Sequence, residues 1–277
     1  MTFPLILLML AGSEPLKPMS DSLPDNKAEA KEASAIAKTE SAGYEFRIGT
    51  NSAAKLTMEP EPILRWTNQL RRRFYGDVYL WTRQGRPEVL ASITTVYGID
   101  RRLETEIHSL SLGRPVLAHN GKQIWEPSRP GVDLKLVAGG VPPGQSPAAR
   151  LRQMRTLAKQ FSASSESGDN RWELRLLPKP VYRYQSTDPQ LLDGALFAFV
   201  KGTDPDAFLM IEARRADHEF RWLFAITRFN GNCTLRVRHG DREVWRVGKL
   251  TGEAIRNPKE PYFALRGERS RVSDGQR

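Results

Sequence analysis

Glu104, Glu106 and His108 are the residues of this chain whose types and spacing best fit acid–base or metal chemistry. They alternate along a segment with strong β-strand character, and residues two apart in a strand share one face, about 7 Å from each other. Two carboxylates and an imidazole on one face can bind a divalent cation or exchange protons with a substrate. The alternative is a solvated strand face with ordinary charges, because a complete ligand set also needs a residue from another strand.

A second candidate site is an arginine followed by an aromatic residue, which occurs twice, as Arg65-Trp66 and Arg183-Tyr184. A guanidinium can bind an anionic ligand while the neighbouring ring stacks on it. The alternative is that both arginines form structural ion pairs, for which Glu45 and Glu173 are the candidate partners.

The sequence lacks the short motifs that carry many known catalytic sites. It has no glycine-rich phosphate loop, no His-Glu-x-x-His, no Gly-x-Ser-x-Gly and no Cys-x-x-Cys. Cys233 is the one cysteine, which excludes a disulfide within the chain and a cysteine-rich metal site. We therefore predict no metal and no cofactor, and the sequence leaves open whether the protein is an enzyme.

These candidates lie within an internal repeat. Two prolines, a β-branched residue, an arginine, an aromatic residue and a glycine recur at a spacing of 178 − 60 = 118 residues, in segments 60–76 and 178–194. A hairpin sequence from histidine to tryptophan recurs at 119–125 and 239–245, a spacing of 245 − 125 = 120 residues. Because composition alone does not produce a fixed spacing of specific residues, we predict two tandem repeats. Asn120-Gly121 favours a type I′ turn in the first hairpin.

The polar strand face belongs to the first repeat only. At a spacing of 118 residues its counterparts are Trp222, Phe224 and Ile226, and at 120 residues they are Phe224, Ile226 and Arg228. A specialised site is expected where the two copies differ, so this difference favours Glu104, Glu106 and His108 as the functional candidates.

A helix is expected at the start of each repeat. Ser146-Pro147 is a typical helix N-terminus, and the run 148–161 has apolar residues at spacings of three and four. The segment 26–39 is its alanine-rich counterpart. Short aromatic and β-branched runs with turn residues follow each helix. We therefore predict an α+β fold in which each repeat is one helix on a curved antiparallel sheet of about six strands, the two repeats being related by a pseudo-twofold axis.

The predicted organisation has six parts: signal segment 1–13, linker 14–25, repeat 26–127, Pro/Gly-rich linker 128–145, repeat 146–248, and a polar basic tail 249–277 that is partly disordered. The short apolar run and the small residues at 11–13 favour export to the periplasm or medium, although the run lacks a basic start. Without a functional signal the protein would be cytoplasmic. No stable transmembrane segment is expected.

The charge balance points to anionic partners. The net charge is +10 and the isoelectric point is 9.9. Such a balance favours an anionic polymer such as nucleic acid or an acidic polysaccharide. The alternative is an ordinary soluble protein, since the charges are spread along the predicted strands. A hydrophobic small ligand in an apolar cavity between sheet and helix is a further possibility.

Several strings resemble an uncharacterised group of bacterial secreted proteins, namely 80–83, 85–88, 146–155 and 192–199. The resemblance covers most of the chain after the linker and implies export, but no activity, cofactor or functional residue. At the level of fold, a helix followed by an antiparallel meander is similar to cystatin-like and NTF2-like folds, which include both binders and enzymes.

These observations lead to three functional hypotheses. The first is a non-catalytic, exported binding or scaffold protein, because the chain combines a duplicated framework with no catalytic motif. The second is a hydrolase-like enzyme that uses Glu104, Glu106 and His108. The third is a binder of anionic polymers through an arginine-rich surface.

Overall fold

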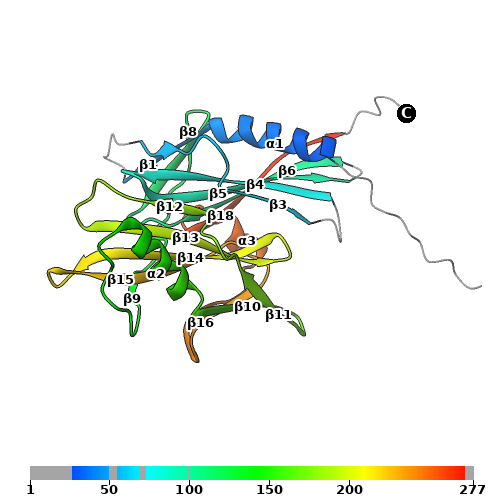
Figure 1. The fold of residues 1–277 in the computed structure, drawn as a ribbon. Coiled ribbons are helices and arrows are strands. Elements are labelled where there is room, and N and C mark those ends of the chain that lie inside the picture. Colours follow the sequence, from blue (N-terminus) through cyan, green and yellow to red (C-terminus); the bar gives the residue numbers. More distant parts are fainter. Residues whose placement is uncertain (1–26, 50–54, 69–72, 99, 272–277) are drawn as a thin grey trace, which may run out of the picture.

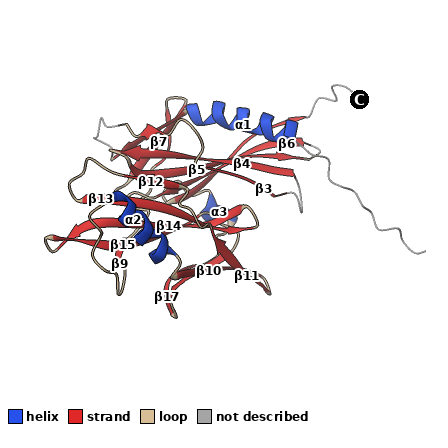
Figure 2. Cartoon of the chain, viewed as in Figure 1, coloured by secondary structure: helices blue, strands red, loops and turns tan. Residues whose placement is uncertain are grey.

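Two curved antiparallel sheets packed against each other form the body of the protein, and a helix covers the outer face of each (Figure 1, Figure 2). The computed structural model describes residues 27–49, 55–68, 73–98 and 100–271. Every strand pair among the three sheets of this part of the chain is antiparallel. The prediction of an α+β fold dominated by antiparallel sheet is confirmed.

The first sheet has the strand order β18-β6-β5-β4-β2, with β3 also paired to β4. Beside it β1, β7 and β8 form a separate small sheet. The elements of this half are α1 (Lys27–Ala42), β1 (Tyr44–Ile48), β2 (Thr57–Met58), β3 (Leu64–Asn68), β4 (Arg73–Arg83), β5 (Arg86–Tyr97), β6 (Asp100–Ser109), β7 (Pro115–His119) and β8 (Lys122–Trp125).

The second sheet has the strand order β17-β16-β10-β11-β13-β14-β15-β9, with β12 also paired to β13. The elements from here to the C-terminal end are β9 (Lys135–Leu136), α2 (Pro147–Ala158), β10 (Phe161–Ser167), β11 (Asn170–Leu176), β12 (Tyr182–Tyr184), β13 (Leu191–Lys201), β14 (Asp204–Ala216), β15 (Glu219–Arg228), β16 (Thr234–His239), β17 (Arg242–Val247), α3 (Gly252–Ile255) and β18 (Tyr262–Arg271).

Local sequence signals correctly predict several of these elements. Ser146 caps α2, since its hydroxyl accepts from the backbone N–H of Ala149 at 3.2 Å, and Pro147 is the first helical residue. Asn120 and Gly121 have φ of 51° and 77°, as a type I′ turn requires. These predictions hold because each depends on a few adjacent residues.

The boundaries of the sheets differ from the prediction. The expected tail 249–277 contains α3 and the ten-residue strand β18, which completes the first sheet by pairing with β6. The expected linker 128–145 contains β9, which adds to the edge of β15. Within the described residues, the first sheet has six strands, in line with the expected number, but one of them is β18 from beyond the predicted boundary. The second sheet has nine strands there and includes β9 from the predicted linker. The expected signal segment and linker, 1–25, lie outside the described residues.

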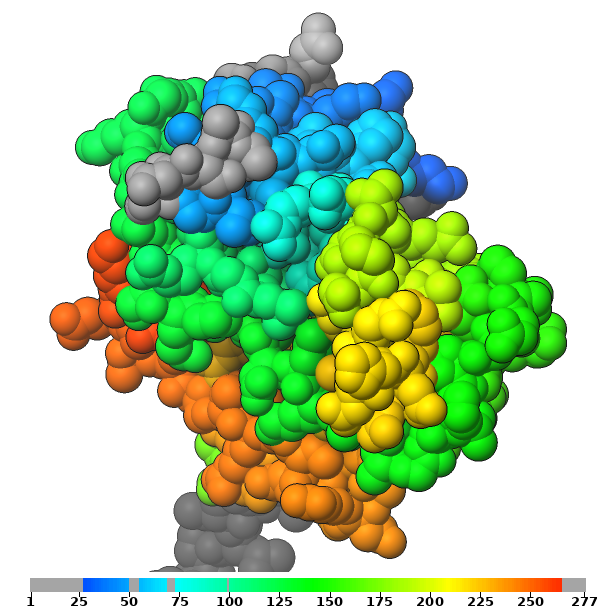
Figure 3. All heavy atoms as spheres, turned by 90° about the vertical axis from the view of Figure 1, so that its left-hand side faces the viewer, coloured from blue at the N-terminus to red at the C-terminus, as the bar shows by residue number. Residues whose placement is uncertain are grey.

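The central strands are buried on both faces. All twelve residues of β5 are buried, because α1 and the small sheet cover one face and the second sheet covers the other. The layer between the sheets is mostly apolar and contains Val78, Leu80, Leu90, Leu196, Phe208 and Met210. Figure 3 shows that the two halves consequently form one continuous surface, with blue and cyan residues against green and yellow ones.

A glycine lies under an aromatic ring at the same place in each half. A Cβ on Gly76 would be 2.3 Å from the ring of Trp66, and a Cβ on Gly194 would be 2.3 Å from the ring of Tyr184. Any side chain at either glycine would displace the ring. The recurrence of this aromatic–glycine spacing in the sequence therefore has a steric reason.

A charged cluster is buried where the two sheets meet. The Arg86 guanidinium on β5 is only 5% exposed, and its Nε donates to Oε1 of Glu212 on β14 at 2.9 Å. Its Nη1 lies 3.4 Å from Glu88 and also donates to the carbonyl of Leu110. The Tyr184 hydroxyl donates to the same Glu212 oxygen at 2.9 Å. Burial works against the charge on Arg86, but the two carboxylates outweigh it and raise its pKa.

We expect Arg86→Met to lower the free energy of unfolding by about 3–5 kcal/mol, because it removes the buried cation that lies between Glu88 and Glu212. Arg65→Met is the control: Arg65 also forms ion pairs, but its side chain is 60% exposed, and such pairs contribute at most about 1 kcal/mol. Denaturant unfolding of both variants measures the difference. Equal losses would show that the buried cluster does not hold the sheets together.

Candidate functional site: a seam cavity and a groove

A cavity of 520 Å³ opens at the seam between the two sheets, and we call it the seam cavity. Strands β3 and β6 of the first sheet line one side of it, and the start of β14 and the segment after β15 line the other. Its principal lining residues are Trp66, Glu104, Glu106, Asp204, Phe229 and Asn230. The structure thus brings two members of the predicted acidic strand face into a cavity.

Two carboxyl groups of the seam cavity, those of Glu106 and Asp204, have raised pKa values. Burial raises the pKa of Glu106 to about 7, and the nearby Asp204 and Glu104 carboxylates add to the effect. The Tyr262 hydroxyl donates a hydrogen bond to Glu106 and opposes part of this rise. Burial, with the neighbouring Asp206, also raises the pKa of Asp204 to about 7. The cavity therefore changes charge near neutral pH.

His108 is separated from the two glutamates. It shares their strand face but is only 1% exposed, stacked on Phe229 at 4.2 Å between ring centroids and in edge contact with Tyr262 at 5.0 Å. Neither ring nitrogen has a hydrogen-bond partner, and burial lowers the pKa of His108 to about 3. The ring is thus neutral and inaccessible at physiological pH, so the predicted trio does not assemble in one cavity.

Arg65 and Trp66 lie on opposite faces of β3, as adjacent strand residues must. Arg65 lies 3.6 Å from Asp77, which also accepts from Ser34 of α1 at 2.5 Å. Trp66 turns the other way, donates to Ser92 at 3.4 Å and lines the seam cavity. The two side chains cannot contact one ligand together, and Arg65 has a structural partner other than the expected Glu45.

Arg183 and Tyr184 also have structural partners. Arg183 donates to Asp193 at 2.8 Å and to the carbonyl of Pro147 at 2.6 Å, which fixes the start of α2. Tyr184 is 3% exposed and belongs to the Arg86 cluster through Glu212. Neither lines the seam cavity or the groove described next. Asp193 replaces the expected Glu173 as the partner of Arg183.

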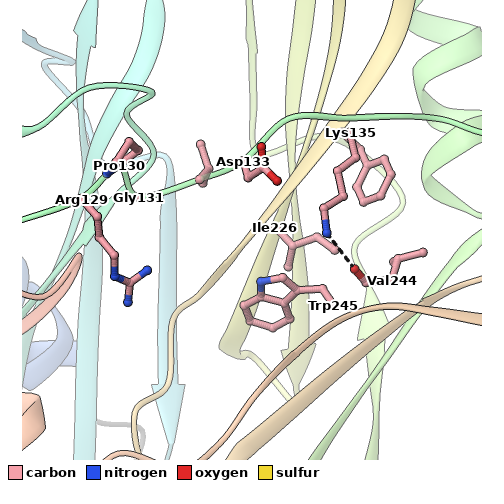
Figure 4. A pocket seen from close by; sticks show the side chains of 10 residues that line it. Arg129, Pro130, Gly131, Asp133, Lys135, Ile226, Val244 and Trp245 are labelled. Atoms are coloured by element: carbon pink, nitrogen blue, oxygen red, sulfur yellow. Dashed lines mark hydrogen bonds between the residues drawn. The ribbon is translucent and has the colours of Figure 1, made fainter.

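A groove lies where the two ends of the second sheet approach each other (Figure 4). The strands at the two ends of this sheet are β9 and β17. The Nζ of Lys135 on β9 donates a hydrogen bond of 3.3 Å to the backbone carbonyl of Val244 on β17. The groove consists of two adjoining hollows of 370 and 260 Å³. The residues that line both hollows are Arg129, Gly131, Ile226 and Trp245.

The sequence did not identify this groove. Trp245 is only half-buried and forms part of the groove wall, whereas Trp125 at the matching hairpin is 1% exposed. Arg228 lines the smaller hollow and is 8% exposed. The sequence does contain one signal for the groove. Trp222, Phe224 and Ile226 alternate as apolar residues along one face of the strand, and Arg228 is the charged residue that follows them on that face.

The described residues contain no cluster of three or more His, Cys, Asp or Glu side chains that could hold a metal ion. No helix in the same part of the chain is both long and apolar enough to cross a bilayer. No protein-family model, curated protein or solved structure matches the chain. The functional argument therefore depends on the geometry of the seam cavity and the groove.

The raised pKa of Glu106 predicts a pH dependence of stability. The folded protein binds this proton more tightly than the unfolded chain, where the pKa has its ordinary value of 4.5. The resulting stabilisation is complete below pH 4.5 and is lost as the pH rises to about 7. Glu106→Gln still accepts from Tyr262 but cannot ionise, so its stability relative to the wild type should rise by about 3 kcal/mol across this interval.

The measurement is the free energy of unfolding of both proteins between about pH 4 and pH 8. Glu45→Gln is a control of opposite sign, because Lys55, at 2.7 Å, lowers the pKa of the exposed Glu45. That variant should lose a little stability relative to the wild type as the pH rises. A constant difference between Glu106→Gln and the wild type would contradict the assigned environment of Glu106.

Proposed function

We propose that this protein is a non-catalytic binding protein whose groove binds a hydrophobic small ligand. The observation that carries this proposal is the open end of the curled second sheet, where Val244 and Trp245 remain partly accessible above the buried Phe224 and Ile226. Phe224, Ile226 and Val244 line the larger hollow with the half-buried ring of Trp245. Ligand pockets are concave, combine apolar walls with polar groups, and are most often about 300–1,000 Å³ in volume. The larger hollow has such a volume, and its lining gains polar groups from Arg129, Asp133 and Lys135.

The rigidity of the groove supports binding. Lys135 links the two ends of the sheet, and Gly131 in the segment before β9 donates to the carbonyl of Ser111 at 3.0 Å. Val132 next to it is 7% exposed and packs into the layer between the sheets. A wall anchored at both ends reduces the entropy lost when a ligand binds.

The scaffold is proposed to be a tandem duplication with pseudo-twofold related repeats. Each half has a helix, a short strand carrying an aromatic residue over a glycine, and three long antiparallel strands in succession. In each half the strand after the helix pairs with the first strand of the His-to-Trp hairpin, β1 with β7 and β10 with β16. Export remains part of the proposal on the basis of the apolar segment 1–13.

A second candidate function is acid–base catalysis in the seam cavity. A carboxyl group with a pKa of about 7 in a cavity is typical of catalytic acids and bases, and Glu106 fits this description. The separation of His108 removes the imidazole from the hydrolase hypothesis and leaves only carboxyl groups and Tyr262. Turnover of any substrate that is lost on Glu106→Gln would favour this candidate over a non-catalytic role.

The groove is expected to bind N-phenyl-1-naphthylamine, an uncharged apolar dye whose fluorescence increases in apolar surroundings. Trp245→Ala should weaken this binding by about tenfold, because the ring supplies wall area to both hollows. Fluorescence titration measures the affinity.

Trp172→Ala is the matched control. Trp172 is another partly buried tryptophan of the second sheet, but its ring contacts Lys201 and does not line the groove. Its removal should leave dye binding unchanged. Equal effects of the two variants, or no binding by the wild type, would contradict the proposed function.

A further inference from the structure

We propose that the natural ligand is an amphiphile with one apolar chain and a carboxylate head group, and that Arg228 binds the head group. This inference rests on the proposed function, since it assigns the polar end of the ligand in the same groove.

Arg228 is a buried cation without a counter-charge. It is 8% exposed, its Nη2 donates to the carbonyl of Gly248 at 2.5 Å, and its Nε has no hydrogen-bond partner. No carboxylate of the described residues forms an ion pair with it. Burying a charge is costly unless it is paired, and the cost lowers the pKa of Arg228. An anion in the smaller hollow would supply the missing charge.

The neighbouring groups do not neutralise Arg228. Glu260 lines the same hollow, but it accepts from Arg129 at 2.8 Å, so these two charges cancel. The Tyr262 ring lies 6.0 Å from the guanidinium carbon, while its hydroxyl is directed to Glu106. One positive charge therefore remains at this end of the groove.

The arrangement of the hollows indicates how the ligand lies. Arg228 lines only the smaller hollow, whereas Ile226 and Trp245 line both and Phe224 lines only the larger one. A head group at Arg228 would thus direct its chain over Ile226 and Trp245 towards Phe224. The larger hollow, at 370 Å³, is near the lower limit for ligand pockets and favours a single chain over a two-chain lipid.

The test compares two ligands that differ only in the head group. Decanoate and decan-1-ol compete with N-phenyl-1-naphthylamine for the wild-type groove near neutral pH, where decanoate is ionised. We expect decanoate to bind about tenfold more tightly than decan-1-ol, because its carboxylate gains a charge-assisted hydrogen bond. Arg228→Gln should remove this preference and leave the affinity for decan-1-ol unchanged.

Two controls complete the design. Arg221→Gln changes another arginine of β15, which is 45% exposed and lies outside the groove, and should keep the preference for decanoate. Acetate tests whether a free carboxylate suffices, and it should not displace the dye at the concentrations at which decanoate does.

Equal binding of decanoate and decan-1-ol by the wild type would overturn the inference while leaving the proposed function in place. A preference that survives Arg228→Gln, or displacement by acetate at the same concentrations, would also overturn it. The wild-type comparison needs no variant, so the test does not depend on the folding of Arg228→Gln. If the dye and both ligands fail to bind, the proposed function itself fails.

Discussion

The buried ion pair between Arg86 and Glu212 is the interaction on which the two-sheet arrangement depends. Each sheet carries one of these charges on the face that the other sheet covers, in an otherwise apolar layer. The other ionic partners, Glu88 for Arg86 and Arg214 for Glu212, lie on the same strand as the residue they contact. The Arg86–Glu212 pair is therefore what links the charges of one sheet to those of the other, and it favours one relative position of the sheets. That position also brings β6 next to the start of β14, where Glu106 and Asp204 meet. The seam cavity is therefore a consequence of how the central charges are paired.

Strands from outside the two halves complete both sheets and create the groove. β9 extends the second sheet beyond β15, and this extra strand reaches β17 through Lys135. Without it the curled sheet would have a wide opening in place of a bounded groove. β18 likewise completes the first sheet. Its residue Tyr262 contacts both the His108 ring and the Arg228 guanidinium, and so fills the space between them. The segments that sequence composition marks as linkers are thus structural.

The sequence predicts local features such as caps and turns well, but it does not predict which distant strands pair with each other. The cap at Ser146 and the turn at Asn120 follow from adjacent residues, whereas the pairing of β18 with β6 depends on contacts far apart in the chain. Strand periodicity correctly places Glu104, Glu106 and His108 on one face. It does not show that Phe229, in the segment after β15, covers His108 and leaves the glutamates accessible.

The strand pairing in the structure relates β6 to β15 at a spacing that differs by one residue from the spacings found in the sequence. Ser109 pairs with Val89, and Arg228 pairs with Ala207, so strand register matches β6 to β15 at 228 − 109 = 119 residues. The sequence comparison gives spacings of 118 or 120 residues between these two strands. A shift of one residue exchanges the two faces of a strand. Under the proposed duplication, the counterparts of Glu104, Glu106 and His108 are therefore Leu223, Ala225 and Thr227, none of which is acidic. The groove residues Phe224, Ile226 and Arg228 belong to the opposite face.

The pairing of β18 with β6 has a consequence for the synthesis of the chain. Tyr262 and Glu106 are 156 residues apart in sequence, so the ribosome produces β6 long before its partner strand. During that interval β6 is an unpaired sheet edge, and such edges attract strands of other molecules. Contacts between distant residues also slow folding. Nascent chains of this protein are therefore most prone to aggregation before residue 262 emerges, and the first sheet is complete only after β18 has been synthesised.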